Sequence, residues 1–151
     1  MTNIDEIMSL LDWNRTEYEQ ETGIQMGMEV QCIKAFFQPA GQHHKNVWHN
    51  CARIISMHTD DQLIPYLLDM LLWIQDLNWP GSLIIMQRLK QFTNVKMLAR
   101  LIEHMLPALE ALDDTPWILS IAELLDNQEL AQEINRKSLA FISKLVSLID
   151  E

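Results

Sequence analysis

The chain has 151 residues, of which 48% are hydrophobic and 21% charged, and its formal net charge is −10. This length and composition predict one globular domain with a substantial core, and they argue against a disordered chain. The acidic surface repels phosphate backbones, so it argues against nucleic acid as the main ligand and favours a basic partner.

The first half of the chain shows helical and not strand periodicity. Apolar residues recur with helical spacing in residues 2–11, 24–37 and 46–57, which we expect to be three helices. The segment 17–21 is acidic, and we expect it to be solvated. Glycine and proline are scarce, and no stretch alternates apolar and polar residues for long enough to form a strand.

A fourth helix is expected over residues 59–75. Thr59 and Gln62 form a capping box at its start, where each side chain can bond the other residue's backbone N–H. Apolar side chains cover nearly its whole circumference, so this helix should be central and buried. Pro65 should kink it or shift its start.

Four further helices are expected in the second half, giving eight in an all-α fold. The helices that follow Pro80 and Asn94 should run to about residues 92 and 112, the second kinked at Pro107. Two more should cover residues 115–125 and 127–149.

The segment 73–82 predicts the turn of a helical hairpin. Its characteristic residues are Trp73, Asp76, Asn78, Trp79, Pro80 and Gly81. We expect Pro80 at the first helical position, and Trp79 mostly buried. Asp76 and Asn78 are interpreted as caps of helix ends; alternatively, they present a polar pair beside the two tryptophans to a small-molecule ligand.

Two segments of the second half echo each other 36 residues apart. Pro80, Leu83, Ile85 and Leu89 recur as Pro116, Leu119, Ile121 and Leu125. A helical unit of this length is typical of stacked hairpins, each burying a face of its neighbour. Turn chemistry shared by two unrelated hairpins is the alternative.

Segment 106–114 with Trp117 and segment 122–125 resembles a HEAT repeat. The chain as a whole, chiefly through Trp-Ile-Gln-Asp-Leu-Asn-Trp-Pro-Gly at 73–81, resembles an uncharacterised bacterial family known only as a domain of unknown function. This resemblance implies a single all-helical domain over 1–151, built as a stack of antiparallel helical hairpins in a HEAT-like α–α superhelix. It implies no assigned activity, although some proteins of similar build act as immunity or adaptor proteins.

Few residues suggest chemistry. His43, His44, His49 and Cys51 lie close in sequence, but His49 and Cys51 point about 200° apart on a helix, and no structural-zinc spacing occurs. We interpret them as loop histidines and a buried thiol. With no phosphate-binding loop, nucleophile elbow or zinc-protease motif, we expect no catalytic, cofactor-binding or metal-binding residues.

Charge is unevenly distributed along the chain. Arg88, Lys90, Lys96 and Arg100 form the only basic ridge, which is either a solvated face or a docking strip for an acidic segment. The acids Glu110, Asp113 and Asp114 stand at a predicted hairpin turn, and we take them as the candidate partner face.

These observations lead to one functional expectation and one alternative. We expect a non-catalytic protein–protein interaction module, an immunity or adaptor protein with an unidentified, basic partner. The alternative is a small-molecule-binding protein or enzyme with a pocket near Trp73, Asp76 and Trp79. With two cysteines and no long apolar run, the cytoplasm is the expected location, without membrane contact. The oligomeric state stays open.

Overall fold

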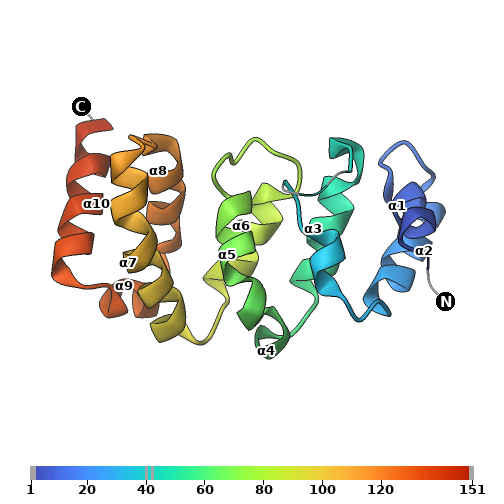
Figure 1. The fold of residues 1–151 in the computed structure, drawn as a ribbon, viewed down its shortest axis with the longest axis horizontal. Helices are drawn as coiled ribbons and strands as arrows, with labels where there is room; N and C mark the ends of the chain where they lie inside the picture. The colour runs from blue at the N-terminus through green and yellow to red at the C-terminus, as the bar shows by residue number, and fades with distance from the viewer. Residues whose placement is uncertain (1–2, 40, 42, 150–151) are drawn as a thin grey trace.

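All regular elements in the described part of the chain are helical. The computed structural model describes residues 3–39, 41 and 43–149. Figure 1 shows the helices standing side by side in an elongated row, with the two ends of the chain at opposite ends of the row. The prediction of an all-α fold is confirmed. No helix of the described residues is both long enough and apolar enough to cross a membrane.

The N-terminal end is a hairpin of α1 (Ile4–Leu11) and α2 (Glu17–Met28). The predicted second helix over 24–37 is wrong, because α2 begins and ends earlier and is followed by a short 3-10 helix, η1 (Ile33–Phe36). Thr16 and Glu19 form a capping box that starts α2. Glu17 and Glu19 of the segment expected to be solvated therefore lie in the first turn, where the helix dipole favours them.

Two glycines let α2 pack closely between its neighbours. A Cβ on Gly23 would lie 2.8 Å from Leu10 Cβ of α1, and one on Gly27 would lie 2.5 Å from Ile54 Cδ1 of α3. Both distances are below any normal carbon–carbon contact, so larger residues would force the helices apart.

The middle of the chain is a series of short helices: η2 (Lys45–Val47), α3 (Trp48–Ser56), α4 (Asp60–Leu63), η3 (Ile64–Tyr66) and α5 (Leu67–Trp73). The Thr59–Gln62 capping box is present. Pro65 lies in η3, where it divides the predicted fourth helix into α4 and α5, as the expected kink requires. The predicted fourth helix is less buried than expected, since Leu68 in its α5 part is 48% exposed.

The C-terminal half contains α6 (Ser82–Lys90), α7 (Val95–Ala111), α8 (Thr115–Leu124), α9 (Gln128–Glu133) and α10 (Arg136–Ile149). Asn94 and Asn127 cap α7 and α9, and Pro107 lies inside α7, as predicted. The predicted last helix is two helices, because Ile134 is extended and the Asn135 side chain accepts from Ser138 N to start α10.

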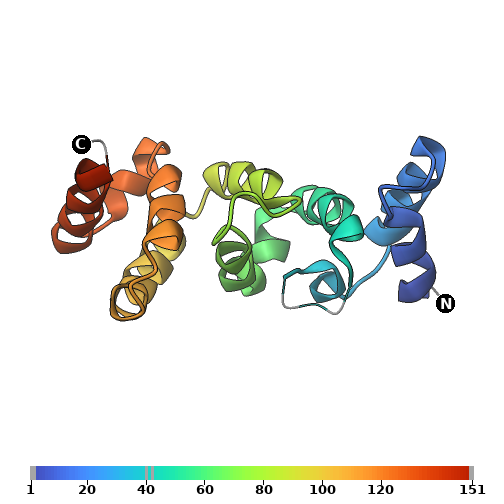
Figure 2. The same cartoon turned by 90° about the horizontal axis from the view of Figure 1, so that it is seen from above.

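The helices form two layers, seen from above in Figure 2. One layer contains α5 and α7; the other contains α3, α6 and α8, each packed against the next, with α10 packed beside α8. Fully buried side chains fill the space between helices, and they include Trp73, Ile85, Leu89 and Ile121. The outward side of the α3–α6–α8 layer is consequently a broad surface built from the sides of helices.

Candidate functional site

The turn between α5 and α6 is fixed by the residues that flank it. Trp73 is fully buried, and its indole Nε1 donates to the backbone oxygen of Pro80 at 3.1 Å. The Ser82 hydroxyl donates back to the Trp73 oxygen at 2.9 Å. These two bonds close the turn and leave Trp73 no surface to offer a ligand.

Gly81 allows this turn to touch α3. Its φ is +82°, and a Cβ there would lie 2.7 Å from Ala52 Cβ and 2.9 Å from the Trp48 oxygen. Only glycine meets both demands. Gly81 precedes Ser82, the first residue of α6, so the expectation that Pro80 occupies the first helical position is wrong.

Trp79 joins the turn to α3 through aromatic contacts. Its ring lies 5.8 Å from that of Trp48 at 86°, and Trp48 meets Trp73 at 6.1 Å and 76°. Such edge-to-face pairs are favourable beyond the area they bury. Less than two fifths of Trp79 is exposed and it packs against the core, so the prediction that it is mostly buried is confirmed.

Asp76 and Asn78 shape the same turn from its outer side. The Asp76 carboxylate accepts from Asn78 N at 2.9 Å, and its backbone oxygen accepts from Trp79 N at 3.1 Å. Asp76 therefore orders the turn itself. The interpretation of Asp76 and Asn78 as caps of helix ends is not confirmed, since Ile74 is the C-cap of α5 and α6 follows Gly81 without a side-chain cap. Asn78 is exposed.

A groove of about 480 Å³ separates this turn from α8. Its lining consists of Gln75, Asp76, Leu77, Asn78, Pro116, Leu119, Ser120 and Glu123. Asp76 and Asn78 thus lie at a concave site, as the small-molecule alternative requires. Trp73 and Trp79, which it also requires, are not part of the lining.

A second groove lies on the next side of α8. It has about 290 Å³ and is lined by Leu119, Ala122, Glu123, Asp126, Val146 and Ile149. Leu119 and Glu123 are common to both grooves, so α8 forms their shared wall. Val146 and Ile149 of α10 make the opposite wall apolar.

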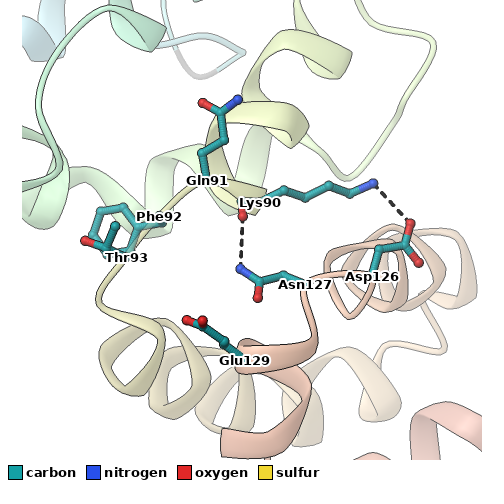
Figure 3. A pocket seen from close by; sticks show the side chains of 7 residues that line it. All are labelled: Lys90, Gln91, Phe92, Thr93, Asp126, Asn127 and Glu129. Carbon is teal, nitrogen blue, oxygen red and sulfur yellow. Dashed lines mark hydrogen bonds and ion pairs between the residues drawn. The ribbon is translucent and has the colours of Figure 1, made fainter.

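A third groove, of about 410 Å³, lies at the end of α8 and is drawn in Figure 3. Its lining is Lys90, Gln91, Phe92, Thr93, Asp126, Asn127 and Glu129. The Asn127 side-chain nitrogen donates to the Lys90 oxygen at 2.9 Å, and Lys90 Nζ lies 3.3 Å from Asp126 and 3.7 Å from Glu123. Asp126 therefore connects this groove with the second.

We name the surface formed by these three grooves the α8 face. The carboxylates near it are Asp76, Glu123, Asp126 and Glu129, and its one lysine is Lys90. The Glu123 and Asp126 side chains are 55% and 75% exposed, although both lie near Lys90, whose side chain is only 20% exposed. The face thus combines a partly apolar floor with accessible negative charge.

Sequence reasoning missed Leu119, Glu123 and Asp126. The 36-residue echo carried a signal for them, because it equates Leu83 with Leu119. Leu83 is 63% exposed, and Leu119 is partly exposed on the neighbouring helix. The recurrence of an apolar residue at this position of both helices was the available clue.

The predicted partner face of Glu110, Asp113 and Asp114 lies at the α7–α8 turn and does not line the α8 face. Asp113 has a φ of +55°, and its N–H and that of Asp114 bond the Glu110 and Leu109 oxygens at 3.0 Å. The Asp114 carboxylate accepts from Trp117 N at 3.2 Å. Two of the three acids thus build helix ends, so reversing all three charges would disturb the fold.

The histidines and cysteine that lie close in sequence are not brought together as ligands. Cys51 is buried beside Met8, and burial raises the pKa of its thiol to about 12. His44 Nδ1 accepts from Asn46 N, while desolvation and then Arg53 lower the pKa of the exposed His49. Within the described residues, no three His, Cys, Asp or Glu side chains are placed to hold a metal.

Most residues of the basic ridge form ion pairs with acids of the same chain. Arg88 pairs with Asp60 at 2.5 Å, and Lys90 lies between two acids. Arg100 pairs with Glu103 at 3.1 Å, and Lys96 is exposed. A continuous strip of free cations, which docking of an acidic segment would need, is therefore not formed.

Comparison with known proteins identifies a family. No curated protein and no solved structure matches the chain. The family described as a domain of unknown function, DUF5071, matches residues 43–150, which include every helix from η2 to α10. The α1–α2 hairpin and η1 lie outside the match, packed on its first helices. The chain therefore belongs to the DUF5071 family.

Proposed function

We propose that this protein is a non-catalytic protein-binding module, of the immunity or adaptor type, that holds a basic partner on its α8 face. The observation that carries the proposal is the joining of three grooves around one helix through Leu119, Glu123 and Asp126. Protein interfaces combine an apolar centre with a polar, solvent-accessible rim, and this surface offers both.

The layered arrangement supports the same proposal. The α5–α6 and α7–α8 hairpins place α6 and α8 side by side in one layer. We propose that this stacking of hairpins forms a HEAT-like superhelix. Stacked helical hairpins present extended surfaces, and proteins with such surfaces bind other proteins along them. We also propose the cytoplasm as the location, where Cys32 and Cys51 stay reduced, as both are free thiols here.

Small-molecule binding is the second candidate. It is favoured by the groove at Asp76 and Asn78, whose volume of about 480 Å³ falls in the range of ligand sites. However, the Asp76 carboxylate already accepts from Asn78 N, and the flanking indoles face α3 or the core. This groove alone supplies less recognition chemistry than the whole α8 face.

Site-specific photo-crosslinking in the native host tests the proposal. A photoreactive amino acid replaces Leu119 on the α8 face or, as the matched control, the exposed His104 of α7 in the other layer. We expect one specific protein to be crosslinked from position 119 and not from 104, and to bind the purified chain. The same products from both positions, or none from 119, would contradict the proposal.

The purified partner then allows a kinetic test. Raising salt from about 50 to 500 mM shortens the screening length from roughly 14 Å to 4 Å. If the partner is basic, the on-rate should fall about tenfold or more, while the off-rate changes little. An on-rate indifferent to salt would show that the acidic charge plays no part in recognition.

A further inference from the structure

The chemistry of the α8 face identifies the kind of segment that it takes. We infer that the bound segment is an amphipathic α-helix with lysine or arginine along one edge of its apolar stripe. This inference rests on the proposed function, and it specifies the partner at the same surface.

The apolar part of the face runs along helix sides. Leu119 and Ala122 of α8 and Val146 and Ile149 of α10 line one continuous groove, and Ile149 is 53% exposed. A segment packed there would bury apolar side chains of its own, spaced as on one face of a helix.

The backbone of the surface favours a helical segment over an extended one. The floor is made of α8 and α10, whose backbone groups are engaged in their own helices, and the described residues contain no strand. An extended peptide gains affinity by adding to a sheet edge, which this surface lacks. A helix pairs the N–H and C=O groups of its interior, so it can lie on helix sides without leaving those groups unpaired.

The carboxylates determine the charge of the segment. Glu123 and Asp126 stand where the grooves meet, more than half exposed, and Lys90 pairs with both of them. An arriving lysine or arginine would share these carboxylates with Lys90 and be repelled by it. The geometry therefore predicts opposite effects for removing the acids and removing the lysine.

Fluorescence anisotropy with a labelled model peptide tests this inference on the full chain. The probe is an amphipathic leucine–lysine peptide of about 15 residues, long enough to form roughly 22 Å of helix. The comparison probes are a scrambled peptide of the same composition and a leucine–glutamate peptide. We expect binding of the first only.

Three variants make the test specific. The double substitution Glu123→Gln with Asp126→Asn should weaken binding about tenfold or more, and Lys90→Gln should tighten it about threefold. Glu6→Gln with Glu17→Gln removes the same charge from exposed positions of α1 and α2 and should change affinity less than twofold or so. Circular dichroism verifies that each variant is folded.

Each outcome has a definite meaning. Equal weakening by the two double variants, or a scrambled peptide that binds as well, would overturn the inference, because attraction would then be general. No binding of the basic helix, together with a specific crosslink from position 119, would overturn it and leave the proposed function standing. No binding and no crosslink would overturn both.

Discussion

The indole Nε1 of Trp117 donates to the backbone oxygen of Leu71 at 2.9 Å, across 46 residues of sequence. Trp117 lies in the first turn of α8 and Leu71 near the end of α5, and both are buried. This bond fixes the helix that carries the candidate site to the neighbouring hairpin. This buried polar contact thus adds to the apolar packing that positions the α8 face.

Trp117→Phe should therefore destabilise the fold while keeping most of the packing. The Leu71 oxygen would lose a donor in a buried place, so we expect the free energy of unfolding to fall by about 1–3 kcal/mol. Urea denaturation followed by circular dichroism measures this. Trp13→Phe at a half-exposed position is the control, expected within about 0.5 kcal/mol of the parent. Equal effects would mean that the bond contributes nothing.

Gly81→Ala should be among the more damaging single-atom changes in the chain. The positive φ costs a non-glycine residue about 1–2 kcal/mol, and the new Cβ must displace Ala52 or the Trp48 backbone. We expect a total loss of about 2–4 kcal/mol in urea melts. A change below about 0.5 kcal/mol would show that the turn does not contact α3 this closely.

Asp113→Gly should stabilise the protein, whereas Gly81→Ala should destabilise it. Asp113 ends α7 in the left-handed region with a φ of +55°, where glycine is the preferred residue. We expect stability to rise by about 0.5–1 kcal/mol. Asp113→Ala removes the same charge but keeps the backbone strain, so it should not stabilise. If both variants gained equally, charge and not conformation would be the cause.

Asp60 should make stability depend on acid pH. Burial alone raises the pKa of Asp60, but hydrogen bonds from Thr93 and the Arg88 guanidinium outweigh it, so the net pKa is lowered. A lowered folded-state pKa gives stability that is complete above the unfolded value of 3.8 and is lost as the pH falls through the folded value.

Asp60→Asn tests that linkage. The variant should be less stable than the parent by roughly 2–4 kcal/mol at pH 7, because Arg88 is left nearly buried beside a neutral partner. The gap should begin to narrow as the pH falls below about 4, where the carboxylate of the unfolded parent takes up a proton, and it should go on narrowing until the folded parent is protonated too. Urea melts across pH 3–7 or so measure it; a gap independent of pH would show that the charge of Asp60 is unimportant.

The parts of the fold that local chemistry determines were predictable from sequence. The Thr59–Gln62 capping box, Asn94, Asn127 and Pro65 each mark a helix end by bonding or blocking nearby backbone groups, and each was found in its predicted place. The start of α2 was missed although Thr16 and Glu19 form such a box, because its few apolar residues gave no helical stripe.

The candidate site was less predictable because it depends on which helices become neighbours. Periodicity shows that Leu119 and Glu123 share a face of one helix, but it does not show that α10 lies beside that face. Leu83 illustrates the same limit, since it is apolar and yet 63% exposed. Asp76 was identified correctly as a turn residue because its bond to Asn78 N is local.

The two cysteines should differ sharply in reactivity towards thiol reagents. The thiolate is the reacting species, and burial raises the pKa of Cys51 to about 12, so almost none of it is ionised at pH 8 or so. Cys32 is exposed, and it should react within minutes, whereas Cys51 should react only as fast as the protein unfolds. Iodoacetamide labelling followed by mass spectrometry of the intact chain distinguishes the two, since one alkyl group should add quickly and the second only in denaturant. Cys32→Ser should abolish the fast phase and leave the slow one. Rapid double labelling of the native parent would mean that the α1–α3 interface, where Cys51 lies against Met8, opens readily.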